Sequence, residues 1–221
     1  MRKAFDFEGP VFSFLSKLAD VIWLNCLFII CSLPVFTIGA STTAMYYVTL
    51  KMARDEEGYV TKSFFKSFKQ NFKQATVIWL IMLLVGTVIL MDYRIVSNPD
   101  FSDIVPSEAL KNVVRVATMM VTVFMAFELS YVFPLLAKFD NSVKNTLKNA
   151  FLMSIRHLPY TLALVLIPVV PVVLIYFYTK ALILIFIMFA LTALCSSMLL
   201  NKVFDHYIPK EDAGGENEEE T

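Results

Sequence analysis

The chain has 221 residues, of which 57% are hydrophobic and 17% are charged, and its formal net charge is zero. A mean hydropathy of +0.65 excludes an ordinary soluble domain. The lysines and arginines form no continuous basic face, which excludes a nucleic-acid-binding surface. Long uninterrupted apolar runs approach the roughly 20 residues that a helix needs to cross a bilayer. We therefore predict an all-α, polytopic transmembrane bundle forming one domain over residues 1–210.

Six apolar segments follow in chain order, and the first two are the less regular ones. Val11 to Leu33 contains Lys17, Asp20 and Asn25, and Ala40 to Met52 is short. The four later runs are each long enough to span alone: Ala75 to Asp92, Val113 to Leu136, Tyr160 to Tyr178, and Ala181 to Leu200.

The first two segments allow two topologies. In one, a single span from about Leu18 to Ile38 leaves the N-terminus outside, giving five spans. In the other, Pro34 to Gly39 forms a tight turn, with Gly39 as the flexible position, and the chain forms a hairpin. We prefer the second, which predicts six membrane segments arranged as three hairpins.

Basic residues are concentrated in two connections, after the second segment and after the fourth. By the positive-inside rule these connections are cytoplasmic, and in the six-segment topology both termini are cytoplasmic as well. The loop from Tyr93 to Leu110 is then external. The tail, residues 211–221 (EDAGGENEEET), is acidic and polar, so we expect it to be disordered in the cytoplasm.

The two cytoplasmic connections have amphipathic helical patterns, and we call them elbow helices. In Thr61 to Lys73, four phenylalanines share one face while four lysines lie largely on the other. We predict that Phe64, Phe65, Phe68 and Phe72 insert at the lipid headgroup boundary, and that Lys66 and Lys69 face anionic lipid or a partner protein. Ser142 to His157 repeats the pattern more weakly, with Val143, Leu147, Phe151 and Ile155.

Glu128 is an acid deep within a predicted span. It lies about 15 Å from the end of its helix near Lys138, so it must face the bundle or a wet cavity. One interpretation makes it a proton or substrate site. The other, which we favour, makes it a polar packing clamp bonded to Asn25, Ser130 or a lysine.

Three further features have mainly structural interpretations. Lys17 and Asp20 form an interface-level pair three residues apart, with Glu128 as an alternative partner for Lys17. Thr37 to Ala44 is rich in small residues that allow close helix packing. Pro168 and Pro171 predict a kink or a local break in their span.

No motif indicates catalysis. The three cysteines lie singly in apolar runs, and there is no metal-ligand cluster, nucleotide-binding glycine loop, GxSxG or HExxH. We therefore expect no enzyme activity, no cofactor, no metal and no disulfide.

Nine short stretches form a recognisable set: Leu24-Asn25, Cys31 to Pro34, Thr37 to Ala40, Tyr46 to Val48, Glu56 to Gly58, Phe72 to Ala75, Tyr131 to Ala137, Leu147 to Ala150 and Arg156 to Pro159. Together they resemble the YesL family of small membrane proteins of Gram-positive bacteria. Ala40 departs from the proline that members often have after the glycine, which bears on turn rigidity. The resemblance implies a place beside carbohydrate ABC importers and glycan-degrading enzymes, and it implies no catalytic or binding residue.

Two functional hypotheses follow. The first is a non-catalytic accessory protein of the cell membrane that associates with a carbohydrate ABC importer, as a subunit or an assembly factor, with membrane lipids and permease subunits as partners. The alternative is a small secondary transporter that uses Glu128.

Overall fold

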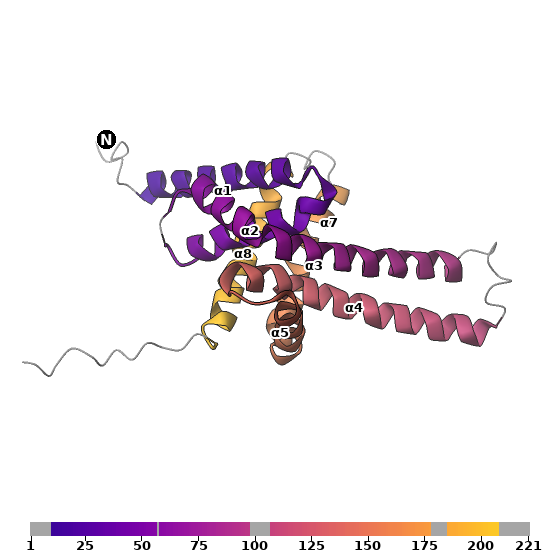
Figure 1. Ribbon diagram of the computed structural model, residues 1–221. Coiled ribbons are helices and arrows are strands. Elements are labelled where there is room, and N and C mark those ends of the chain that lie inside the picture. The colour runs from indigo at the N-terminus through magenta and orange to yellow at the C-terminus, as the bar shows by residue number, and fades with distance from the viewer. Residues whose placement is uncertain (1–9, 57, 98–106, 178–184, 208–221) are drawn as a thin grey trace, which may run out of the picture.

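The computed structural model describes residues 10–56, 58–97, 107–177 and 185–207, and within these ranges the chain is helical with no strand. The all-α prediction is confirmed. Figure 1 shows the elements in order: α1 (Pro10–Ser32), the 3₁₀ turn η2 (Val35–Thr37), α2 (Ile38–Met52), α3 (Val60–Ser97), α4 (Glu108–Lys138), α5 (Val143–Arg156), α6 (Leu158–Leu166), α7 (Val169–Phe177) and α8 (Ile185–Phe204).

Five helical segments in the described ranges are long and apolar enough to cross a membrane: Leu15–Ser32, Val60–Val96, Glu108–Lys138, Leu158–Phe177 and Ile187–Phe204. The helix α2, with 15 residues, is about 22 Å long and therefore shorter than a typical hydrocarbon core. The chain thus has the helices of a multi-pass membrane protein, while the choice between six and five membrane segments stays a prediction.

The reversal after α1 occurs at Pro34 and η2. The Thr37 hydroxyl donates to the carbonyl oxygens of Cys31 and Pro34, both at 2.6 Å, and so closes the turn. Gly39 is not the flexible position of this turn, as the sequence had suggested, because it lies in the first turn of α2. Its missing side chain instead allows close packing: a Cβ atom there would lie 2.5 Å from the Ala75 carbonyl oxygen and 2.6 Å from Trp79 Cβ.

The first elbow is not a separate helix. The helix α3 runs without a break from Val60 to Ser97, 38 residues or about 57 Å, nearly twice the thickness of a hydrocarbon core. The amphipathic pattern of residues 61–73 continues into the apolar run because no proline or glycine interrupts the chain between Val60 and Val85. The predicted elbow is therefore the first third of one long helix.

The second elbow and the predicted break in the later span both appear. The helix α5 is a separate 14-residue element, and the Ser142 hydroxyl at its start accepts from the Asn145 amide at 3.4 Å. The chain is interrupted at Ile167 and Pro168 between α6 and α7, where a proline removes a helical hydrogen bond. Pro171 lies in the first turn of α7, where its missing N–H has no helical acceptor.

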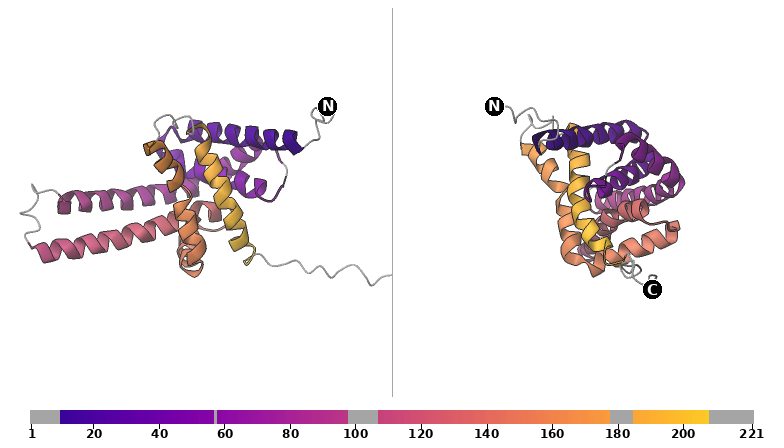
Figure 2. Two further views of the ribbon diagram at one scale, coloured as in Figure 1. Left: turned by 180° about the vertical axis from the view of Figure 1, so that it is seen from behind. Right: turned by 90° about the vertical axis from the view of Figure 1, so that its left-hand side faces the viewer.

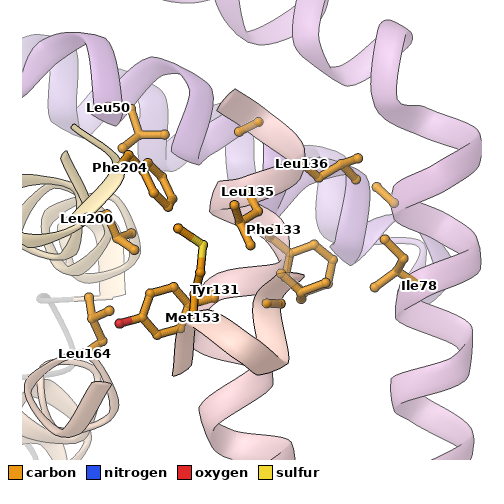
Figure 3. Close-up of a cluster of buried hydrophobic side chains, with 14 of the residues drawn as sticks. Leu50, Ile78, Tyr131, Phe133, Leu135, Leu136, Met153, Leu164, Leu200 and Phe204 are labelled. Carbon is orange, nitrogen blue, oxygen red and sulfur yellow. The ribbon is translucent and has the colours of Figure 1, made fainter. Parts of the chain in front are cut away.

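The largest buried cluster lies where α4 crosses α2, α3, α5, α6 and α8 (Figure 3). Tyr131 of α4 lies toward Met153 of α5, Leu164 of α6 and Leu200 of α8, while Phe133 of α4 points to the side of Ile78 on α3. A second cluster joins α1, α2, α8 and the start of α3. The outer halves of α3 and α4 extend away from these clusters as a two-helix arm (Figures 1 and 2).

The ends of several elements meet on one side of the bundle. Lys17 Nζ lies 2.5 Å from Asp55 Oδ1, which joins an early turn of α1 to the α2–α3 loop. Arg54 in the same loop forms an ion pair with Asp205 after α8. His157, between α5 and α6, contacts the hydroxyl of Tyr207. Both connections that are rich in basic residues therefore lie at the same end as the start of α1 and the end of α8.

Candidate functional site

Glu128 lies two thirds of the way along α4, and its side chain is half-buried. No described residue forms an ion pair or hydrogen bond with its carboxyl group. Phe124, one turn earlier on the same side of α4, packs against Phe151 of α5 with ring centroids 5.8 Å apart. Glu128 thus lies beside the α4–α5 contact, with its carboxyl group unpaired in the described part of the chain.

Asn25 is not the partner of Glu128. Its side chain is fully buried between α1 and α8, where the amide donates to the Ile185 carbonyl at 2.9 Å and the oxygen accepts from the Ala190 N–H at 3.0 Å. Ser130 donates to the Ala126 carbonyl within α4. The predicted clamp with these two residues is therefore wrong, and Asn25 instead fixes α1 to the backbone of α8.

Lys17 and Asp20 do not pair with each other, and Lys17 does not meet Glu128. The antiparallel packing of α1 and α2 brings the α2–α3 loop beside α1, so the Lys17 amino group binds Asp55 instead. Both side chains of this ion pair are largely exposed, so it contributes little to stability. Asp20 lines an adjacent groove.

This groove has a volume of about 790 Å³ and is bounded by α1, residues 58–59 and the start of α3. We call it the lysine groove. Its lining combines three lysines, three aromatic residues and one acid with three further residues at or just before the start of α3. The lining residues are Asp20, Trp23, Gly58, Tyr59, Val60, Thr61, Lys62, Phe65, Lys66 and Lys69.

The four phenylalanines of the first elbow have different environments. Phe64 is fully buried against α1 and α2, so the prediction that it inserts among lipid headgroups is wrong. Phe68 and Phe72 are half-buried and pack with the clusters, while Phe65 is exposed and lines the lysine groove. The stripe faces protein because α3 continues straight from the elbow and lies against α2 along this length.

Lys62, Lys66 and Lys69 are exposed, as the pattern predicted, and their spacing of four and three residues places them on one side of α3. No spacing in the sequence indicates that Trp23, Tyr59 and Thr61 line one groove with these lysines. The Trp23 indole donates to the Thr61 hydroxyl at 2.8 Å, which ties α1 to the head of α3. Trp23 lies in the middle of its apolar run, so its position in the sequence gave no signal of this contact.

A smaller cavity of about 340 Å³ lies between α4, α5 and the end of α8. Arg156 and Tyr207 line it, and the Arg156 guanidinium lies 5.7 Å from the centre of the Tyr207 ring. His157 Nε2 is 3.0 Å from the Tyr207 hydroxyl. Burial lowers the pKa of His157, with smaller contributions from the charges of Arg156 and His206, so this ring favours the neutral form.

Long apolar helices, buried polar clamps and a basic, aromatic groove beside a span define a multi-pass helical membrane protein. Residues 21–93, which include nearly all of the lysine groove, match the family described as "Protein of unknown function, DUF624". The family match covers residues 21–93, and the relatives below, one of them YesL, extend the similarity to about two thirds of the chain.

Two relatives from Bacillus subtilis (strain 168) are similar to this chain. The protein described as "Uncharacterized protein YteU" is 30% identical over 146 residues, covering 66% of this chain and 61% of the relative. "Uncharacterized protein YesL" is 26% identical over 144 residues, covering 65% of this chain and 63% of the relative. The alignments therefore span less than two thirds of each relative. No solved structure matches the chain.

Proposed function

We propose that this protein is a non-catalytic accessory component of the cell membrane that associates with a carbohydrate ABC importer, as a subunit or an assembly factor. The importer context rests on the YesL resemblance. The observation that carries the association is Glu128, a carboxyl group within a span that no described residue pairs. Such a group in the hydrocarbon region is costly, so a polar group from a neighbouring membrane helix is its natural partner.

The arm formed by α3 and α4 provides a surface of the right kind for such a neighbour. Its outer residues are apolar and exposed, including Val113, Val116, Met119 and Met120 of α4 and Leu84 of α3. Flexible methionines adapt to irregular partner surfaces. The exposed α4 residues of the arm and Glu128 lie on the same helix. A single partner helix running beside α4 therefore contacts both.

The association is tested by affinity purification of the full chain in mild detergent, followed by identification of the retained proteins. We expect permease and solute-binding subunits of a carbohydrate importer to be retained. Glu128→Leu leaves the partner's polar group without a hydrogen-bond partner and should weaken the free energy of association by about 1–3 kcal/mol. Glu128→Gln keeps a hydrogen-bonding group and should still retain the partner proteins. Partner-free recovery of the wild-type chain would contradict the proposal.

A secondary transporter is the alternative that the same residue supports, because an unpaired intramembrane acid is also a feature of proton-coupled carriers. Sugar uptake in cells carrying Glu128→Gln at normal abundance separates the two functions. For an accessory protein we expect unchanged uptake. Lost uptake with intact folding and intact partner association would favour the carrier, since the charge change drives its cycle.

A further inference from the structure

We infer that the lysine groove is a binding site for the headgroup of an anionic phospholipid. This inference does not depend on the accessory role or on Glu128. It rests on three observations about the groove: its charge, its position beside a span, and its aromatic walls.

The charge of the lining favours a phosphate. Lys62, Lys66 and Lys69 place three amino groups along one side of α3, and Asp20 is the one acid among the lining residues. Val60 and Thr61 head α3, and the N–H groups of a first helical turn have no acceptor within the helix. The three lysines and the first residues of α3 thus line one open volume, which suits a phosphodiester.

The position of the groove selects a lipid over a soluble anion. One wall is α1, whose residues Leu15–Ser32 have the length and hydropathy of a span. Ile30, two helical turns after the groove residue Trp23 and on the same side of α1, is exposed. An acyl chain leaving the groove therefore meets apolar surface directly, whereas a soluble anion gains nothing from it.

The aromatic lining matches the boundary between hydrocarbon and water. Trp23, Tyr59 and Phe65 are all exposed in the groove, and Trp and Tyr concentrate at headgroup level in membrane proteins. The hydrogen bond from Trp23 to Thr61 fixes the indole against the head of α3. The groove is thereby formed before any lipid enters, and basic residues near this boundary attract anionic headgroups.

Trp23 provides a direct probe of the site. The chain has two tryptophans, and the other, Trp79, lies elsewhere and donates to the Val35 carbonyl. A Trp79→Phe chain, reconstituted in phosphatidylcholine vesicles, is mixed with brominated phosphatidylglycerol or brominated phosphatidylcholine at equal fractions. We expect the anionic lipid to quench Trp23 selectively. The reciprocal Trp23→Phe chain, which reports from Trp79, should show no preference.

Variants that remove lysine charges show which part of the protein prefers the anionic lipid. Combining Lys62→Gln, Lys66→Gln and Lys69→Gln should lower the relative affinity for phosphatidylglycerol at least about fivefold, given the strength of lysine attraction to anionic surfaces. Lys144→Gln, Lys148→Gln and Lys202→Gln remove the same charge from exposed positions outside the groove and should leave the affinity unchanged. If the two triple variants lowered the affinity for phosphatidylglycerol equally, the proposal would be wrong, because general attraction to the charged surface would then explain the binding.

Three further measurements identify what occupies the groove. Mass spectrometry of lipids that copurify with the wild-type chain should show enrichment of phosphatidylglycerol, which the groove variant loses. Displacement of the lipid preference by millimolar glycerol phosphate would assign the site to a soluble phosphate instead. Crosslinking of Lys66 or Lys69 to protein in place of lipid would assign it to a partner's acidic surface.

Discussion

Gly39 shows how a single missing side chain sets the packing of this protein. A Cβ atom at this position would lie 2.5 Å from the Ala75 carbonyl oxygen on α3 and 3.1 Å from Phe133 Cε1 on α4. Backbone cannot yield as a flexible side chain can, so the helices must separate to admit a methyl group. Gly39 therefore keeps α2, α3 and α4 in contact.

We predict that Gly39→Ala lowers the free energy of unfolding by about 1–3 kcal/mol, as overpacking of a tight contact does. Gly86→Ala is the matched control on α3, because its Cβ would lie 3.5 Å from Met125 Cε, an ordinary contact. Denaturant titration in detergent micelles measures both. Equal stability of the two variants would show that the helices do not pack at this distance.

The lowered pKa of His157 should make the stability of the protein depend on pH. The pKa of this histidine lies below the ordinary value of 6.5, mainly through burial, so the unfolded chain takes up a proton first as the pH falls. The contribution of this group is complete above pH 6.5 and is lost as the pH falls through the lower pKa of the folded state. The melting temperature should therefore decrease between about pH 7 and pH 5.

The variant that isolates this effect is His157→Gln, which can still bond to the Tyr207 hydroxyl but does not titrate. We expect a shallower decrease in melting temperature over the same pH range. An unchanged slope would assign the pH dependence to other groups.

At the scale of elements, the sequence predicted the helices well because each apolar run has the length of a span. The runs at Ala75 to Asp92 and Val113 to Leu136 lie within α3 and α4, and the prolines predicted the interruption between α6 and α7. Periodicity could not show that Phe64 faces protein, since an apolar stripe looks the same against lipid and against α1.

Long-range pairing accounts for the other differences. Asn25 and Lys17 were correctly identified as polar residues within an apolar segment, but their partners, Ala190 and Asp55, lie far away in sequence. No local spacing encodes such contacts. The groove was equally hidden, because Trp23 and Lys66 meet only through the packing of α1 against the head of α3.

The break between α6 and α7 makes a testable prediction. Pro168 and Pro171 both lack an N–H, and in a continuous helix each ring would crowd the carbonyl four residues earlier, so the double variant Pro168→Ala/Pro171→Ala should allow one continuous helix from Leu158 to Phe177. That helix would be about 30 Å long. Spin labels at its two ends should report a longer separation in the variant than in the wild-type chain. Identical distances would mean that neighbouring helices, not the prolines, impose the break.

For the whole molecule, the meeting of element ends supports the six-segment topology. The ion pair between Lys17 and Asp55 places the start of α1 at the same end as the α2–α3 loop, whereas a single span over residues 18–38 would separate them. Tyr207 contacts His157 at that end as well. The predicted acidic tail, residues 211–221, lies outside the described residues.

Cysteine labelling in intact cells tests this topology. In a chain whose three native cysteines are replaced, cysteines introduced at Lys66, Lys144 and Lys17 should be protected from an impermeant reagent, while one at Ser107 should react. Residues 98–106 of the predicted external loop, Tyr93 to Leu110, lie outside the described residues. A reporter fused before Arg2 that is active only on the outer side would favour five spans.

The contact of Asn25 with α8 has a consequence for biogenesis. The chain leaves the ribosome from its N-terminus, so α1 enters the bilayer well before α8, which supplies both backbone partners of the Asn25 side chain. During that interval a buried amide lacks its final hydrogen bonds in a medium without water. We therefore expect the insertion machinery to hold the first helices until α8 arrives, and a chain truncated before α8 to be degraded by membrane quality-control proteases.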